Sequence, residues 1–157
     1  MQRIPMTARG FSRLQEELKH LKTVERIAVI KAISEARALG DLSENAEYHA
    51  ARERQGFIEG RIAELEAKLS LAEVIDVAKL RGDIVRFGAS VKLVDEETGE
   101  ESIYQIVGVD ESDIKKGFLS ISAPLARSLI GKKTGDSVEV HTPGGSKTYE
   151  IISVEFV

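Results

Sequence analysis

The sequence has no cysteine, no long apolar run and few histidines. Each of these absences excludes a class of protein. Without cysteine there are no disulfides, no thiolate zinc sites and no cysteine nucleophiles. The three histidines are scattered, which argues against a preformed transition-metal site. No apolar run approaches the roughly 20 residues that cross a bilayer. The first ten residues also lack the apolar core of a signal peptide, so we expect a cytoplasmic protein without membrane contact.

The composition is that of a globular protein with little bulk attraction for nucleic acid. Hydrophobic residues make up 42% and charged residues 31% of the 157 positions, which does not fit a disordered chain. The net charge of −4 argues against a protein that coats nucleic acid electrostatically. Residues 1–78 carry 12 basic and 13 acidic side chains, and residues 79–157 carry 10 and 13. Any contact with nucleic acid should therefore be local.

Proline is absent between Pro5 and Pro124, so nothing forces a helix to end in the first half of the chain. Thr7 suits the N-cap of a first helix, and Gly40 breaks the helical pattern. Two helices of about 28 residues, each about 40 Å long, are predicted to form an antiparallel coiled-coil hairpin. The apolar residues with the required spacing, interrupted by Glu25, are Leu14, Leu18, Leu21, Ala28 and Ala32, then Ile58, Ile62, Leu65, Leu69 and Ala72. Beyond Val24 the apolar set of the first helix widens to Ile27, Val29, Ile30 and Ile33.

The second half changes to short alternating or β-branched runs separated by turn signals. The predicted strands are 84–87, 90–94, 102–109, 118–122, 137–141 and 147–157, with one short helix from Pro124 to Gly131. The predicted fold is therefore α+β with two domains, a hairpin over 1–78 and a mostly antiparallel sheet with one helix over 79–157. His141 has no nearby nucleophile, and the TPGG turn at 142–145 precedes no helix, so it is not a phosphate loop. This half is predicted to be a scaffold or docking module.

Two carboxylates at the turn of the hairpin are the most informative feature. Asp41 and Glu44 lie three residues apart, and carboxylate oxygens suit a hard cation such as Mg²⁺. Two are too few to hold Mg²⁺ tightly, so the pair is better suited to completing a metal site supplied by a partner. The same spacing also fits an N-cap and capping box, with negative charge that complements the helix dipole. Spacing alone leaves both interpretations open.

Arg37 and Arg52 flank this tip on the two predicted helices. On a hairpin they could share a face and contact a phosphate backbone, although solvated surface arginines are the simpler interpretation. Tyr48 and His49 could stack on a base or lie partly buried near the helix end.

The segment GDLSENAEYHAARERQGFIEGRIAELEAKL, residues 40–69, resembles the bacterial transcript cleavage factors of the GreA/GreB family. The resemblance extends over essentially the whole chain, including the opening MTARGFSRLQEELKHLK and the closing SAPLARSLIGKKTGDSVEVHTPGGSKTYEIISVEF. It is strongest to the GreA branch, and the tip followed by YHAARE is a specific motif.

The resemblance implies a function that residue spacing does not establish. It implies an FKBP-like C-terminal domain that docks on RNA polymerase at the rim of its secondary channel, which the coiled coil enters. Asp41 and Glu44 would then help bind a catalytic Mg²⁺ of the polymerase, which cuts the 3′ end of backtracked RNA. Arg37 and Arg52 would contact the nascent RNA.

Further expectations concern partners and docking. The protein is expected to be monomeric when it acts, not to be an enzyme by itself, and to bind no cofactor in isolation. We place the docking residues at Ser122, Pro124, Arg127 and Gly131, because this segment presents a short helix beside the sheet.

Two alternatives remain at this point. One is a non-cleaving regulator that enters the same channel, although both Asp41 and Glu44 are present without an enlarged acidic cluster. The other is a peptide-binding chaperone or prolyl isomerase built on the C-terminal half, since fold does not determine function.

Overall fold

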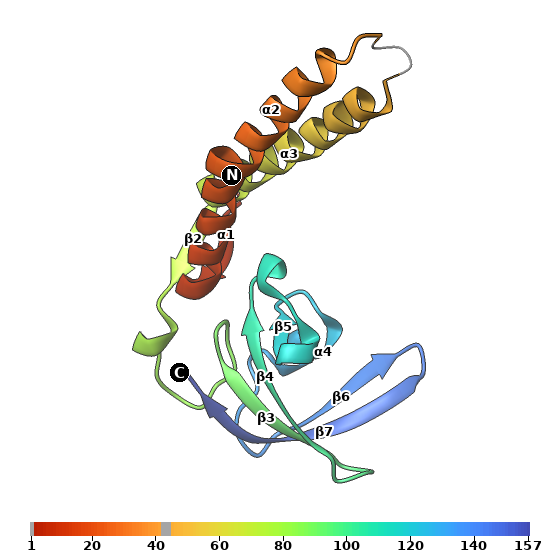
Figure 1. Ribbon diagram of the computed structural model, residues 1–157. Helices are drawn as coiled ribbons and strands as arrows, with labels where there is room; N and C mark the ends of the chain where they lie inside the picture. The colour runs from red at the N-terminus through yellow and green to blue at the C-terminus, as the bar shows by residue number, and fades with distance from the viewer. Residues whose placement is uncertain (1, 42–44) are drawn as a thin grey trace. The chain divides into compact units, whose positions relative to one another are not determined.

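The computed structural model describes residues 2–41 and 45–157, and these fall into two compact units (Figure 1). One unit comprises Phe11–Ala72 together with Gln2, and the other comprises Arg3–Gly10 and Glu73–Val157. The first is helical, and the second is built on a five-stranded sheet. The predicted helical hairpin and the sheet with one short helix are both confirmed.

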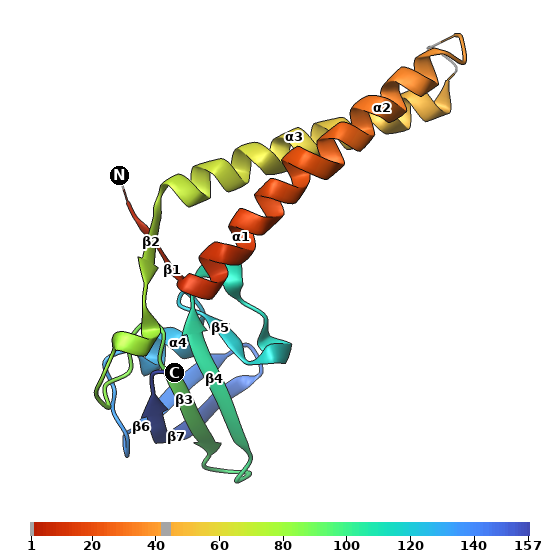
Figure 2. The same ribbon diagram turned by 60° about the vertical axis from the view of Figure 1, so that its left-hand side comes forward.

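Three helices form the hairpin: α1 (Ala8–His20), α2 (Arg26–Arg37) and α3 (Ala46–Ser70). A π-helical turn, Leu21–Glu25, joins α1 to α2 without a break. Figure 2 shows the α1–α2 arm beside α3, with the chain running in opposite directions along the two arms. The 25 residues of α3 span about 37 Å at 1.5 Å per residue. No helix in the described part of the chain is long and apolar enough to span a membrane.

The π-helical turn shifts the buried seam of the first arm away from the predicted positions. Ala28 is exposed and Ala32 only half-buried, whereas their neighbours Val29 and Ile33 are buried. A π-turn places one extra residue in the helix, so the seam continues from Leu21 to Val29 rather than to Ala28. Ala28 and Ala32 are therefore wrong as seam residues, whereas Val29 and Ile33 of the wider apolar set form the seam. The polar residue that interrupted the pattern marks the place where the spacing changes.

Ion pairs join the two arms along both edges of this seam. Arg26 donates to both carboxylate oxygens of Glu59, at 2.8 and 2.7 Å. Arg61 contacts Glu17 in the same bidentate way, at 2.6 and 2.9 Å, and this hydrogen bonding holds the pKa of the Glu17 carboxyl below its ordinary value. These pairs are partly exposed, so each contributes little stability. Because the two residues of a pair are in contact, they mark the faces of the two arms that lie on the same edge of the hairpin.

The second unit is a mixed sheet with the strand order β5-β4-β3-β7-β6. Three of its four pairings are antiparallel, and the pairing of β4 with β5 is parallel. The strands are β3 (Ser90–Asp95), β4 (Glu101–Val107), β5 (Phe118–Ser120), β6 (Ser137–Thr142) and β7 (Gly145–Glu155). The strand predicted at 84–87 is wrong, because only Ile84 makes an isolated bridge, to Lys133. Glycines with positive φ, Gly82 and Gly88, flank this segment and turn the chain out of an extended path.

The short helix α4 (Pro124–Leu129) packs its buried residues Ala126 and Leu129 into the core of the sheet. That core includes the fully buried Leu93 and Ile106. Pro124 occupies the first turn of α4, as predicted, because proline lacks only an N–H that would be unpaired there.

An N-terminal segment that the sequence did not identify as a strand completes the second unit. β1 (Ile4–Thr7) pairs with β2 (Ala72–Ile75) in a separate two-stranded sheet. The Thr7 hydroxyl accepts a hydrogen bond from the Gly10 N–H at 3.0 Å, which confirms the predicted N-cap.

Thr7 is also bound to a buried carboxylate, Glu111, which is 4% exposed. The Thr7 hydroxyl and the Thr7 N–H both donate to Glu111, the latter at 3.0 Å. The Gly108 N–H donates to the same carboxylate at 2.9 Å. A Cβ atom at Gly10 would overlap the Glu111 carboxylate, so a larger residue at this position would displace that carboxylate. Glu111 thus attaches the start of α1 to the turn that follows β4.

Candidate functional site: the tip of the helical hairpin

The tip is the chain between α2 and α3. The first arm ends at Arg37, with Ala38 as its C-cap, and Gly40 follows with a φ of 112°. Asp41 is exposed. Glu44, the second predicted carboxylate, lies outside the described residues.

Asn45 connects the two arms of the hairpin at this tip. Its side-chain oxygen accepts a hydrogen bond from the Tyr48 N–H at 3.0 Å, which makes it the N-cap of α3. Its side-chain amide donates to the carbonyl of Ala36 in the last turn of α2, at 2.6 Å. Asn45 is not among the predicted site residues, although asparagine immediately before a helical run is a preferred N-cap.

The role of Asn45 shows that Asp41 is not the N-cap of α3. α3 begins at Ala46, so Asp41 lies four residues before the N-cap and is not the cap itself. At the N-terminus of α3, the group that accepts the backbone hydrogen bond is the neutral amide of Asn45. Stabilisation of α3 by capping therefore does not account for an acidic residue at position 41.

We expect Asn45→Ala to loosen the tip, because it removes both hydrogen bonds. Loss of an N-cap costs about 1–2 kcal/mol, which corresponds to an increase of roughly 5- to 30-fold in local opening. Amide hydrogen exchange at Tyr48 measures this opening directly. Asn45→Asp is the matched variant: it keeps an acceptor for the Tyr48 N–H but loses the donor to Ala36. Its exchange rate should fall between those of the other two proteins, and equal rates in all three would contradict the assigned role of Asn45.

Arg37 and Arg52 lie on one edge of the hairpin, as the hypothesis of a shared face requires. The ion pair between Arg26 and Glu59 defines that edge. Arg37 follows Arg26 by eleven residues, close to three helical turns, and Arg52 precedes Glu59 by seven, close to two. Both arginines are exposed. Within residues 2–41 and 45–157 neither forms an ion pair, and Arg52 donates only to Gln55, at 3.2 Å.

The aromatic pair beside the tip is arranged edge to face. The rings of Tyr48 and His49 lie 5.5 Å apart at 68°. Tyr48 is half-buried and His49 is exposed. The His49 ring is therefore accessible, whereas the Tyr48 ring is partly covered.

The predicted docking residues surround α4 in the second unit, and all four are exposed. Ser122 precedes the helix and shares a hydrogen bond with Ser120 at 2.8 Å. Pro124 opens the helix and Arg127 lies in its last turn. Gly131 has a φ of 88°, and its N–H donates to the carbonyl of Val85 at 2.9 Å.

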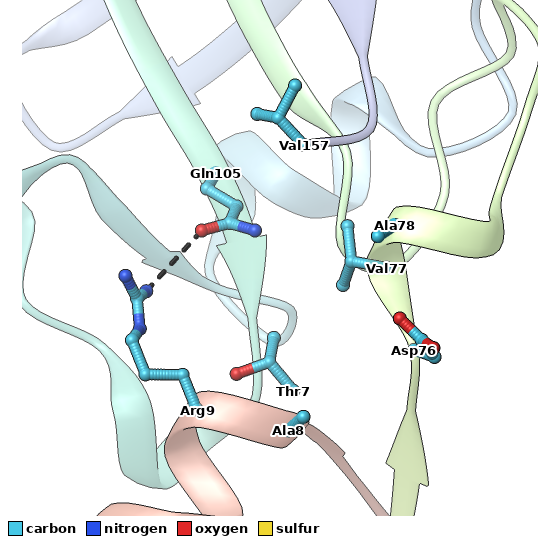
Figure 3. Close-up of a pocket in the computed structure, with 8 residues that line it drawn as sticks. All are labelled: Thr7, Ala8, Arg9, Asp76, Val77, Ala78, Gln105 and Val157. Carbon is cyan, nitrogen blue, oxygen red and sulfur yellow. Dashed lines mark hydrogen bonds between the residues drawn. The ribbon is translucent and has the colours of Figure 1, made fainter.

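The second unit also contains a shallow pocket of about 200 Å³, shown in Figure 3. Its polar groups are already bound to the protein. Arg9 donates to Gln105 at 3.5 Å (Figure 3) and lies 4.1 Å from the Phe118 ring centre. The Thr7 hydroxyl is engaged by Glu111. The residues that line the pocket therefore connect the N-terminal segment to the sheet. They show no catalytic arrangement.

In the part of the chain that the structure describes, no three His, Asp or Glu side chains are grouped closely enough to hold a metal ion. The exposed Asp41 carboxylate has the oxygen chemistry of a Mg²⁺ ligand. A single ligand of this kind contributes to a metal site only together with ligands from elsewhere.

Comparisons with known proteins agree over the whole chain. Residues 4–74 match the family model "Transcription elongation factor, N-terminal", and residues 80–156 match "Transcription elongation factor, GreA/GreB, C-term". The chain is 68% identical to transcription elongation factor GreA of Cereibacter sphaeroides (strain ATCC 17025 / ATH 2.4.3) and 64% identical to that of Phenylobacterium zucineum (strain HLK1), in both cases over all of each chain. Among solved structures it is similar to GreA/GreB from Nitrosomonas europaea, with 23% identity, 99% and 100% coverage and a TM-score of 0.44. It is also similar to Gfh1 of Thermus aquaticus, with 25% identity, 99% coverage of each chain and a TM-score of 0.45.

Proposed function

The chain belongs to the GreA/GreB family of transcription elongation factors, and from this we propose that the tip of its hairpin acts inside RNA polymerase. The hairpin enters the secondary channel, and the tip stimulates the polymerase to cleave the 3′ end of backtracked nascent RNA. The C-terminal unit docks at the channel rim. An arrested complex then resumes synthesis from the new RNA end.

One observation carries this proposal: an exposed carboxylate, Asp41, stands at the end of a hairpin whose arm α3 is 25 residues long. Capping of α3 does not account for it, because Asn45 performs that role. A hairpin about 37 Å long is suited to carrying a chemical group into a deep channel.

The chemistry is the assembly of a metal site from two proteins. When bound in the polymerase active site, Mg²⁺ stabilises the charge that develops in phosphoryl transfer and lowers the pKa of a bound water. Asp41, together with Glu44, would supply carboxylate oxygens that hold this ion and orient the attacking water. The chain is therefore not an enzyme by itself, and it has no cofactor of its own.

Arg37 and Arg52 hold the extruded RNA on one edge of the hairpin. Guanidinium groups bind phosphate oxygens in a fork geometry, which positions a backbone without reading its sequence. The small number of arginines on this edge limits the length of RNA that it grips. We further propose that the protein acts as a monomer in the cytoplasm.

The test is a cleavage assay on a stalled, backtracked complex of bacterial RNA polymerase. Addition of the protein with Mg²⁺ should shorten the labelled RNA from its 3′ end and allow elongation to restart, while the protein without polymerase should leave RNA intact. Binding to the polymerase without cleavage would contradict the proposal and indicate a non-cleaving regulator.

A further inference from the structure

The basic and acidic residues of the C-terminal unit are segregated along the chain, although the total charge of this half gives no indication of its function. Two short segments, 79–86 and 127–133, contain six of the ten basic side chains of residues 79–157 but only one of the thirteen acidic ones, Asp83. The remainder of this half therefore carries four basic and twelve acidic side chains. A concentration of positive charge on an acidic unit indicates a local electrostatic function.

The structure brings the two segments together. Ile84 forms a bridge with Lys133, the Val85 N–H donates to the Lys132 carbonyl at 2.7 Å, and the Gly131 N–H donates to the Val85 carbonyl. A hollow of about 230 Å³ lies on this surface between Arg81 and Arg86. We call this region the basic surface. It consists of Arg81, Arg86, Lys132 and Lys133 together with Ile84 and Ile130.

Two carboxylates lie at the basic surface: Asp83 lines the same hollow, and the Asp136 carboxylate accepts a hydrogen bond from the Lys133 N–H at 3.0 Å. The two arginine side chains nevertheless make their contacts with other groups. Arg81 donates to the carbonyls of Ala78 and Leu80, and Arg86 donates to the carbonyl of Arg81 and lies 5.2 Å from the Phe156 ring centre. These contacts hold both guanidinium groups in place without compensating their charge. In the part of the chain that the structure describes, none of the four basic residues of this surface forms a side-chain ion pair.

Exposed apolar side chains among these charges distinguish between two kinds of partner. Ile84 is 55% and Ile130 38% exposed. A phosphate backbone offers hydrogen-bond acceptors and charge but no apolar surface, so it would leave both isoleucines uncovered. A protein surface that combines apolar side chains with a carboxylate rim would bury the isoleucines and pair with the cations.

We propose that the basic surface is a docking site for an acidic, partly apolar protein surface of RNA polymerase. This inference rests on the proposed function, whose docking step it specifies. It is continuous with the predicted docking residues, since Gly131 is bonded to Val85 and Ile130 is the C-cap of α4. The isoleucines form the centre of the contact and the four cations its rim.

The test separates docking from the chemistry at the tip. In the full chain, Lys132→Glu combined with Lys133→Glu reverses two exposed charges, and the matched control is Lys115→Glu with Lys116→Glu. The control pair is also adjacent and exposed, and it lies in the short 3₁₀ turn Ile114–Lys116 of the same unit. Circular dichroism should show native folding for both proteins.

Binding is measured on core polymerase without nucleic acid, and cleavage on a backtracked complex at increasing factor concentration. For Lys132→Glu/Lys133→Glu we expect about 10- to 100-fold weaker binding and the same increase in the half-maximal concentration for cleavage. The maximal cleavage rate at saturation should be unchanged, because the tip is intact. The control should remain within about twofold of the original protein, and Ile84→Ala should weaken binding by about tenfold.

Three results would overturn the inference. The first is unchanged binding of the Lys132/Lys133 variant, and the second is equal weakening by the control. The third is weakening that occurs only in the presence of DNA or RNA, which would assign the surface to nucleic acid. Failure of the proposed function is distinguishable from all three, because the unaltered protein would then produce no cleavage at any concentration.

Discussion

Replacement of Asp41 by asparagine is expected to abolish stimulated RNA cleavage while leaving the protein folded and bound to RNA polymerase. Asparagine has nearly the same shape as aspartate but lacks the negative charge that holds a divalent cation. Loss of a carboxylate that helps hold a catalytic metal ion removes several kcal/mol of transition-state stabilisation. We therefore expect the maximal cleavage rate to fall by at least about 100-fold.

We do not expect Asp41→Asn to destabilise the protein, even though it should abolish the activity. Asp41 is exposed and does not cap α3, which is capped by Asn45. Asparagine keeps the shape of aspartate and one side-chain acceptor oxygen, so the free energy of unfolding should change by less than about 0.5 kcal/mol. Thermal unfolding and polymerase binding of Asp41→Asn should therefore match those of the unaltered protein.

Glu47→Gln is the matched control, because Glu47 is an exposed carboxylate in the first turn of α3. It removes one negative charge close to the tip, so a general electrostatic effect would lower cleavage in both variants. We expect the control to retain most of its activity. Full-strength cleavage by Asp41→Asn would show that Asp41 is not a metal ligand in the complex.

Removal of the Glu111 carboxylate is expected to cause the largest loss of stability. Glu111→Ala leaves the buried N–H groups of Thr7 and Gly108 without their acceptor, and each unsatisfied buried donor costs about 1–3 kcal/mol. We expect a total loss of about 2–4 kcal/mol, measured by urea unfolding of the second unit. Thr7 also caps α1, so hydrogen exchange at the Gly10 amide should accelerate.

Two further variants test whether the carboxylate itself carries this effect. Glu111→Gln keeps one oxygen acceptor and should recover part of the stability. Gly10→Ala introduces a Cβ atom that would overlap the Glu111 carboxylate, so it should destabilise the protein even though alanine favours helix. If Glu111→Ala unfolds at the same urea concentration as the unaltered protein, the buried contact does not stabilise the unit.

Local patterns in the sequence determined the element types. The absence of proline between Pro5 and Pro124, together with 4-and-3 spacing, predicted the hairpin correctly because helix formation depends on neighbours within one or two turns. Thr7 as N-cap and Pro124 in the first turn of α4 were predicted for the same reason. Alternation predicted β3 and β6 with small errors at their ends. The acidic tip was recognised from its residues and motif, although its role remains a prediction.

Only the tertiary structure decided which side chains meet. The extra residue of the π-helical turn moved the seam from Ala28 to Val29, and no local preference specifies that shift, because it depends on packing against α3. The Asn45 contact with Ala36 and the Glu111 contact with Thr7 join residues 9 and 104 positions apart. The two segments of the basic surface lie more than 40 residues apart in the chain. Interactions over such separations form only when the chain has folded. The residue types available at the tip, in contrast, are given directly by the sequence.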